Sequence, residues 1–326
     1  MSRPNIKLDR MNPLSNALNV KAEEPMSLHT TLRVGGSSDL YWQADNVDEL
    51  GELMSKLQIA EEPFTLIGEG SNVCIADAGV RGLVIQNRCS GLKLGELTEV
   101  DCGYNLMRLS FLAMREGLDG LAWAVGIPGT VGGALVSNAG AYRGNIGPLV
   151  ASLEVVENGT RKWVGPEWME FSYRDSRLRR NPMVSSVLLR VRLRLCKGIR
   201  EIIRSQMREF QRQRISKQPW GPSAGSFFKN VNNSSLAHSL SQLPEALKQV
   251  GVVPAAVLTE ACDCKGLRVG GAEVSVRHAN FVVNSNNATA NDIRNLTQIM
   301  KKRVFEQFGV VLEEEVLFMG DWRSEG

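Results

Sequence analysis

The chain has 326 residues, 43% of them hydrophobic and 22% charged, which is typical of a globular protein with two or three domains. Its formal net charge of +3 argues against a dedicated nucleic-acid binder, because such domains are strongly basic. No window of about 18 apolar residues occurs, and residues 1–20 lack the apolar stretch of a signal peptide, so we expect a cytoplasmic protein without a membrane partner. Its six cysteines predict reduced thiols, and no zinc-like spacing or other metal motif is found.

The first part of the chain predicts a tail followed by a small α+β lobe. We expect residues 1–25 to be loosely ordered and residues 26–95 to form the lobe. Its strands and its one helix are predicted within residues 32–44, 47–58, 64–72 and 81–87. The helix prediction depends on spacing, because one helical face collects Val47, Leu50, Leu53, Met54 and Leu57.

A second lobe is expected over residues 96–215. It contains a strand and a helix within 99–124, a glycine-rich stretch at 126–147, and three strands at 151–159, 160–164 and 184–195. An Asn-Gly turn is predicted to join the first two of these three strands. The lobe continues into a helix at residues 198–219, whose outer face carries an arginine every fourth position: Arg200, Arg204, Arg208 and Arg212. These arginines either steer a phosphorylated ligand or form an ordinary solvated face.

Two prolines, Pro219 and Pro222, interrupt the chain and mark the boundary of a final domain over residues 216–322. Its long helix is predicted at residues 287–309. A capping box at Thr289 and Asp292 would begin this helix, and Gly309 would end it. A strand is expected to follow at residues 310–320.

Two glycine loops are candidates for holding a phosphorylated cofactor. IGEGSN (67–72) follows an apolar strand and can form a nest for phosphate oxygens, although alone it is more typical of a structural turn. It matches neither the Rossmann fingerprint nor the P-loop. The second loop (126–142) contains five glycines. Loops of that length are usually functional, and binding of a pyrophosphate by its backbone amides would explain this one. Together the loops suggest an extended dinucleotide.

Charged and hydroxyl side chains near other motifs are candidates for catalysis. Arg174, between Tyr173 and Asp175, is either a fixed cation for a carboxylate or part of a surface salt bridge. In LEEEV (312–316), strand alternation places Glu313 and Glu315 on one face, which is either a solvated edge or a functional acid.

The stretch GPSAGSFFKN (221–230) sets one hydroxyl, Ser226, between small residues and two phenylalanines. It predicts either a hydroxyl turn beside a satellite hydrophobic cluster or a proton donor at the edge of a pocket. His278 is assigned to packing or hydrogen bonding in preference to catalysis, because no partner is visible in the sequence.

Seven stretches occur in a fixed order along the chain: TLRVGG (31–36), IGEGSN (67–72), GIPGTVGGALVSNAGAY (126–142), YRDSR (173–177), PSAGSFFKN (222–230), KGLRVGGAEVSVRHANFVVN (265–284) and FGVVLEEEV (308–316). Together they resemble the UDP-N-acetylenolpyruvoylglucosamine reductase family, the flavoenzymes of bacterial cell-wall precursor synthesis. The resemblance implies an α+β fold: a two-lobed FAD-binding unit of the vanillyl-alcohol-oxidase (PCMH) type, followed by a C-terminal α+β substrate-binding domain.

The same resemblance implies the cofactor, the partners and the site residues. FAD would be the cofactor, NADPH the hydride donor, a UDP-sugar the substrate, and the protein a monomer. The proton donor falls on Ser226, the catalytic arginine on Arg174 and the catalytic glutamate on Glu315. Substrate contacts fall on Lys217, Asn230 and Lys265. FAD contacts fall on Gly68, Gly70, Ser71, Asn72, Ile127, Pro128, Gly129, Thr130, Gly132, Gly133, Asn138, Gly140 and Ala141.

The chain departs from the family's pattern in two places. Glu314 stands where a proline usually precedes the catalytic glutamate, which leaves the local strand geometry open. The segment between Arg174 and Ser226 is short, which resembles the subtype that lacks a tyrosine loop over the substrate. Two rivals stay open: an oxidase or other FAD-dependent oxidoreductase of the same fold, and a sugar-nucleotide-binding protein without chemistry.

Overall fold

The computed structural model describes residues 19–181 and 186–322, so most of the predicted tail, residues 1–18, lies outside the described residues. The chain divides into two units that interleave along the sequence. Unit 1 consists of residues 1–24, 38–69 and 80–214, and unit 2 of residues 25–37, 70–79 and 215–326. The predicted boundaries of the two lobes and of the final domain stay a prediction.

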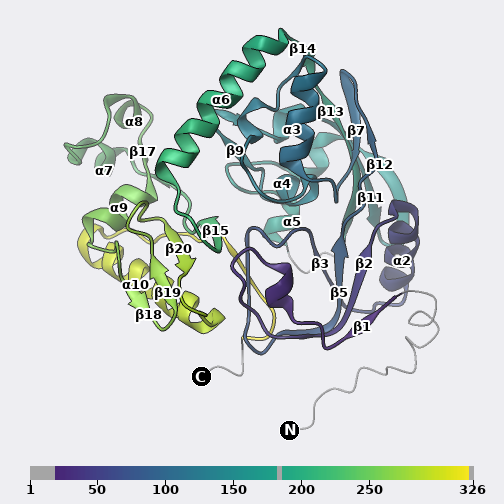
Figure 1. The fold of residues 1–326 in the computed structure, drawn as a ribbon, viewed down its shortest axis with the longest axis horizontal. Helices are drawn as coiled ribbons and strands as arrows, with labels where there is room; N and C mark the ends of the chain where they lie inside the picture. The colour runs from purple at the N-terminus through teal and green to yellow at the C-terminus, as the bar shows by residue number, and fades with distance from the viewer. Residues whose placement is uncertain (1–18, 182–185, 323–326) are drawn as a thin grey trace. The chain divides into compact units, whose positions relative to one another are not determined.

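The first sheet of unit 1 has the strand order β1-β2-β5-β3, formed by Lys21–Ala22, Ser38–Ala44, Val80–Asn87 and Phe64–Ile67. β2 and β3 both run parallel to β5, while β1 pairs antiparallel with β2 (Figure 1). Helix α2 (Val47–Ile59) begins at Asn46, whose side chain accepts hydrogen bonds from the amides of Asp48 and Glu49. All five residues predicted for its apolar face are buried, so the helical spacing was read correctly.

The second sheet of unit 1 is antiparallel, in the order β12-β11-β13-β7-β6 (Thr160–Val164, Val150–Glu157, Val187–Arg194, Leu97–Asp101 and Leu92–Lys93). β11 and β12 are joined through Asn158 and Gly159, both at positive φ, as a tight hairpin requires, which confirms the predicted turn. The short helix α4 (Val131–Val136) contacts β7 and β13.

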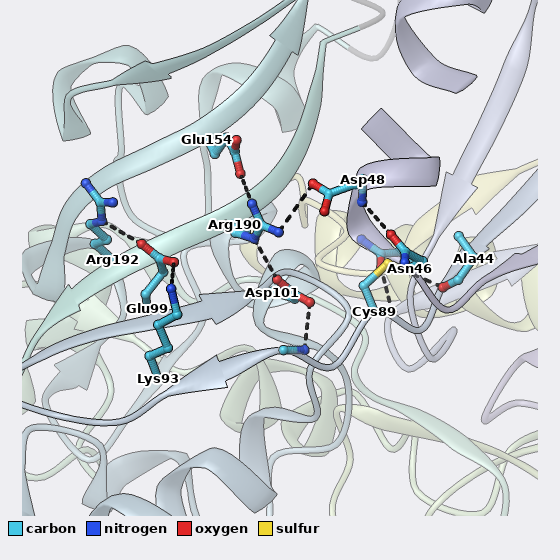
Figure 2. A network of polar contacts seen from close by, with 12 residues as sticks. Ala44, Asn46, Asp48, Cys89, Lys93, Glu99, Asp101, Glu154, Arg190 and Arg192 are labelled. Atoms are coloured by element: carbon cyan, nitrogen blue, oxygen red, sulfur yellow. Dashed lines mark hydrogen bonds and ion pairs between the residues drawn. The ribbon is translucent and has the colours of Figure 1, made fainter. Parts of the chain in front are cut away.

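One face of this sheet carries a network of acidic and basic side chains around Arg190 of β13, shown in Figure 2. The Arg190 guanidinium lies 3.1 Å from Asp101, 3.0 Å from Glu154 and 3.5 Å from Asp48. Because Asp48 belongs to α2 and the other acids to β7 and β11, the network ties the helix to the sheet.

The other elements of unit 1 are short, apart from one long helix. α3 (Leu106–Arg115) precedes the glycine-rich loop, and α6 begins at Arg200 and ends at Lys217, close to the predicted helix. The remaining helical turns are η2 (Ala122–Ala124), η3 (Gly147–Leu149), η4 (Pro166–Met169) and α5 (Arg177–Arg180). The remaining strands are the pairs β8–β14 (Leu118–Asp119 with Cys196–Lys197) and β9–β10 (Gly140–Ala141 with Gly144–Asn145).

Unit 2 is built around a sheet in the order β15-β20-β19-β18 (Ser223–Ser226, Phe281–Asn284, Ala272–Val274 and Arg268–Val269). Helix α10 (Ala290–Phe308) contacts β18, β19, β20 and α9 (Ala255–Ala261) (Figure 1). The predicted capping box of Thr289 and Asp292 is present, and Gly309 ends the helix in a left-handed conformation. The other elements of the unit are η1 (Met26–His29), β4 (Val73–Ile75), β16 (Val231–Asn232), α7 (Ser234–Ser239), α8 (Glu245–Gln249), β17 (Val252–Val253) and β21 (Leu317–Met319).

The strand expected over residues 310–320 is wrong in extent, because only β21 is regular, and it pairs in parallel with β4. The preceding residues make a single bridge, between Phe228 and Glu314. Within the described part of the chain, no helix has the length and apolar character needed to span a membrane.

Candidate active site

The two glycine loops meet within unit 1. A Cβ added to Gly68 would lie 2.4 Å from the Thr130 hydroxyl, so only glycine allows this approach. The Glu69 carboxylate accepts a hydrogen bond from the Gly129 amide at 3.2 Å and from the Asn105 amide nitrogen at 2.9 Å. The structure therefore joins the first loop to the start of the second, as two loops acting on one ligand require.

The second loop leads into helix α4 through Thr130, whose hydroxyl accepts a hydrogen bond from the Gly133 amide at 3.2 Å. A Cβ on Gly132 would approach the Cys102 carbonyl oxygen to 2.9 Å, and Gly129 has a φ of +112°. Both positions thus require glycine, and the loop exposes backbone rather than side chains. This fits a bound pyrophosphate, which needs close approach of backbone amides.

The end of that loop is attached to the segment that carries Arg174. Asn138, whose φ is +43°, donates from its side chain to the Ser172 carbonyl at 2.7 Å and accepts from the Gly147 amide at 3.1 Å. Arg174 donates a hydrogen bond to the Gly140 carbonyl oxygen. The side chain of Asn138, predicted as a cofactor contact, thus holds the site together.

Arg174 has a left-handed backbone with a φ of +52°, and its guanidinium lies 5.4 Å from the centre of the Tyr173 ring. Its neighbour Asp175 forms an ion pair with Arg180 at 2.9 Å. Non-glycine residues in this conformation are costly and concentrate at functional sites. The aromatic neighbour expected for Arg174 is therefore present, and the backbone around it is held in a strained form.

Ser226 ends strand β15 in unit 2, directly after a backbone irregularity. The pairing of β15 with β20 shifts register between Ser223 and Ser226, and Gly225 between them has a φ of +83°. A Cβ on Gly225 would meet nothing within 4 Å, so conformation rather than crowding requires glycine there. Bulges of this kind redirect a side chain beside active sites. Open space thus lies beside Gly225, and Ser226, which follows it, is half-buried.

The alternative reading of this stretch, a hydroxyl turn beside a satellite cluster, is confirmed for the turn and wrong for the cluster. The hydroxyl that accepts from a local amide is that of Ser223, which bonds the Gly225 amide at 3.2 Å. Phe227 and Phe228 are fully buried in the main hydrophobic core of unit 2. The phenylalanines therefore anchor the residue that precedes them.

The backbone after Ser226 is held from both sides. On one side, the Asn280 side chain accepts from the Phe228 amide and donates to the Phe228 carbonyl, each at 2.9 Å. On the other side, the Glu315 amide donates to the Phe227 carbonyl at 2.7 Å. One rigid segment therefore fixes the backbones next to both predicted catalytic residues of unit 2.

The three glutamates before β21 have different surroundings. Glu313 forms an ion pair with Lys229, and Glu314 forms one with Lys301 of α10 at 2.6 Å. Glu314, at the position where the family usually has proline, is thus tied to a helix instead. The Lys229 ammonium is thus occupied by Glu313.

Residues 70–72 of the first glycine loop lie in unit 2. Gly70 has a φ of +62°, and a Cβ there would overlap the His29 carbonyl oxygen at 2.0 Å. The Asn72 side chain donates to the Glu315 carbonyl at 3.0 Å, and its own carbonyl accepts from the Leu317 amide. Sequence reasoning assigned Asn72 to the cofactor and missed its contact with the backbone of the predicted catalytic glutamate.

Two of the predicted substrate residues of unit 2, Lys217 and Lys265, lie near His278. Lys265 forms an ion pair with Glu260 at 2.5 Å, and the Asn230 side chain accepts from the Ala255 amide at the start of α9. Burial lowers the pKa of His278, and the nearby charges of Lys265 and Lys217 lower it further. The ring accepts from the Asn280 amide at 3.3 Å and packs edge-on against Phe281, so His278 has the packing and hydrogen-bonding role that was favoured for it.

A polar depression of about 400 Å³ in unit 2 lies elsewhere. It is lined by Arg33, Pro222 and residues 284–288, none of which was predicted as a site residue. The Asn284 amide donates to the Pro222 carbonyl, so this depression lies next to the start of strand β15.

Comparison with known proteins places both parts of the chain. A model described as FAD binding domain matches residues 38–164, and one described as UDP-N-acetylenolpyruvoylglucosamine reductase, C-terminal domain, matches residues 214–319. The reductase of that name from Anoxybacillus flavithermus is 36% identical over 94% of this chain and 96% of its own length. The one from Thermotoga petrophila is 34% identical over 90% of this chain and 96% of its own length.

A solved structure agrees with these matches. The crystal structure of UDP-N-acetylenolpyruvylglucosamine reductase from Thermus caldophilus superimposes with a TM-score of 0.74 at 32% identity, covering 92% of this chain and 99% of that one. These matches define an FAD-dependent oxidoreductase with a two-lobed FAD-binding unit and a C-terminal α+β domain, which confirms the predicted fold class and cofactor. The chain belongs to the UDP-N-acetylenolpyruvoylglucosamine reductase family, and it is a reductase of peptidoglycan precursor synthesis.

Proposed function

We propose that the protein reduces the enolpyruvyl group of UDP-N-acetylglucosamine enolpyruvate to give UDP-N-acetylmuramate, with NADPH as the source of hydride. The relatives of the same name, which match over almost their whole length, support this substrate. The observation that carries the proposal is the bulge at Gly225, which has open space beside it and lies directly before the half-buried Ser226.

FAD would be held by the two glycine loops. We assign it to Gly68, Gly70, Ser71, Asn72, Ile127, Pro128, Gly129, Thr130, Gly132, Gly133, Asn138, Gly140 and Ala141. When bound, FAD supplies the hydride-carrying chemistry that links NADPH to the substrate. Because the side chains of Asn72 and Asn138 are engaged within the protein, these two residues would contribute mainly through their backbone.

Arg174 would meet the substrate carboxylate. Hydride addition at the terminal enolpyruvyl carbon places negative charge on the α-carbon and the carboxylate oxygens. A guanidinium keeps its positive charge and can donate two parallel hydrogen bonds to a carboxylate, so it stabilises this charge as it develops. Its anchorage to the Gly140 carbonyl fixes its position before the substrate binds.

Ser226 would deliver the proton that the α-carbon then needs, from one face of the substrate. Glu315, whose backbone is held by Phe227 and Asn72, would polarise the substrate carboxylate. Lys217, Asn230 and Lys265 would contact the sugar nucleotide.

The test is an anaerobic titration of the FAD-loaded protein with NADPH and then with the enolpyruvyl sugar nucleotide. Ser226→Ala should still let NADPH bleach the flavin but should block its reoxidation by the substrate. Ser226→Cys, which retains a proton donor, should recover part of the rate, and Ser239→Ala on helix α7 serves as the control. Normal turnover by Ser226→Ala would refute the proton-donor assignment. Wild-type flavin that is reoxidised by oxygen but not by the substrate would favour the oxidase alternative.

A further inference from the structure

Arg214, near the end of α6, has a buried side-chain nitrogen without a partner. Its Nε makes no hydrogen bond to any residue within 19–181 and 186–322. Buried N–H groups are nearly always paired, and a guanidinium can only donate. The missing acceptor is therefore expected to come from a molecule that binds here.

The Arg214 side chain is held in place by its surroundings. Its guanidinium lies 5.5 Å from the centre of the Tyr142 ring. Tyr142 stacks on Phe210 with 4.1 Å between ring centres, and its hydroxyl donates to the Phe210 carbonyl at 3.0 Å. A Cβ on Gly126 would come within 3.0 Å of the Arg214 Cδ. The cation thus lies against the glycine-rich loop and is oriented before any ligand arrives.

The charges around Arg214 are those of an incomplete ion pair. Burial lowers the pKa of Arg214, and the positive charge of Arg174 lowers it further. Tyr142 alone among the described residues acts in the opposite direction, and no carboxylate does. A buried guanidinium beside a second cation, with no carboxylate to offset its charge, is unfavourable unless an anion occupies the site.

Backbone strain is concentrated in the same place. Asn138, Tyr142, Arg143 and Arg174 are all non-glycine residues at φ values between +43° and +65°. The hydrogen bonds of Asn138 to Ser172 and of Arg174 to Gly140 hold these segments together. Strained segments persist where the surrounding contacts over-determine them, as happens in ligand sites.

We propose that Arg214 and Arg174 together form a two-cation site for the carboxylate of the enolpyruvyl substrate. This inference rests on the proposed function. A carboxylate has lone pairs enough to accept from both guanidiniums. Hydride addition raises the charge on the acid from one negative charge toward two, and a second cation matches that increase.

The experiment separates the carboxylate from the rest of the ligand. Isothermal titration of the FAD-loaded protein would compare UDP-N-acetylmuramate, which carries a carboxylate, with UDP-N-acetylglucosamine, which does not. We expect Arg214→Gln to weaken binding of the first about tenfold to a hundredfold, as for a lost hydrogen bond to a charged group, and to leave binding of the second unchanged. Arg212→Gln is the matched control, because Arg212 lies on the same helix with its side chain 76% exposed.

Arg214→Lys keeps the positive charge but cannot donate two parallel hydrogen bonds. It should therefore weaken binding of UDP-N-acetylmuramate alone, and by less than Arg214→Gln does. It also keeps the test decisive if Arg214→Gln does not fold. Equal losses for both ligands, or no loss, would overturn the inference. So would loss of bound FAD with unchanged affinity for UDP-N-acetylmuramate, because the anion would then belong to the cofactor. Failure of the wild-type protein to bind either sugar nucleotide would instead refute the proposed function.

Discussion

Unit 1 contains two groups of arginines with opposite surroundings. Arg190 lies among three carboxylates, those of Asp48, Asp101 and Glu154 (Figure 2). Burial and the positive charge of Arg174 lower the pKa of Arg214, and no carboxylate of the described residues raises it. Its Nε is buried and makes no hydrogen bond to the described residues. The described residues thus supply carboxylate partners for Arg190 and none for Arg214.

The Arg190 group therefore stabilises the fold, whereas Arg214 and Arg174 are assigned to ligand binding. The Arg190 group joins α2 to the second sheet, and its acids have further donors: Arg161 pairs with Glu154 at 2.7 Å, and the Gly91 amide donates to Asp101 at 2.6 Å. Such a network is stable as it stands. Arg214, at the glycine-rich loop, gains its missing acceptor only when an anion binds, so breaking each group should affect a different measurement.

The largest expected effect on stability comes from Arg190→Met. It leaves the buried carboxylate of Asp101 without its cation and removes one of the two cations that pair with Glu154, which costs about 3–5 kcal/mol in the free energy of unfolding. Urea unfolding would measure this loss. Arg192→Met is the control, because Arg192 is 40% exposed and pairs with Glu99 at the surface, where a pair contributes about 1 kcal/mol or less. Equal losses in the two variants would contradict the structural role of the Arg190 network.

Arg174→Ala should affect chemistry instead. We expect the reoxidation of the reduced flavin by the enolpyruvyl substrate to slow by about 10²- to 10³-fold, or 3–4 kcal/mol in barrier height, as for loss of an oxyanion-hole donor. Stopped-flow absorbance of each half-reaction would measure this, with Arg180→Ala as a nearby control. Reduction of the flavin by NADPH should stay normal, and a selective loss of that step would contradict the role given to Arg174.

Much of the fold follows from local signals. The apolar spacing of α2, the Asn158–Gly159 hairpin and the capping box of Thr289 and Asp292 each depend on residues close in sequence, and each is present. The division into units does not follow from such signals, because residues 25–37 and 70–79 join the C-terminal unit through contacts distant in sequence. The bond from Asn72 to Glu315, which joins residues 243 positions apart, is of the same kind.

The motifs of the candidate site can be found in the sequence, but Arg214 cannot. The regular spacing of arginines on α6 drew attention to the exposed face of that helix, which ends at Arg212. Arg214 lies two residues further on, and at about 100° per residue it points to roughly the opposite side. No sequence pattern distinguishes this residue, because its meaning depends on Gly126 and Tyr142, which fold against it.

The smallest expected effect concerns pH and contrasts two acids of unit 1. A hydrogen bond from Lys162 lowers the pKa of Glu157, and Arg177 lowers it further. Burial raises the pKa of Asp101 in spite of its bonds to Gly91 and Arg190. A lowered pKa contributes stability above the ordinary value of 4.5, and this contribution is lost as the pH falls through the folded-state pKa. A raised pKa contributes below the ordinary value of 3.8, and this contribution is lost as the pH rises.

Glu157→Gln should therefore flatten the loss of stability below about pH 4.5, by about 1 kcal/mol or less, as for a single partly exposed ion pair. Asp101→Asn should do the opposite and make the loss on acidification steeper, because it removes a group that gains stability when protonated. Urea unfolding of both variants at several pH values between about 3 and 7 would show the two signs. If both variants flattened the dependence of stability on pH to the same extent, the proposed difference between the carboxylates of Glu157 and Asp101 would be wrong.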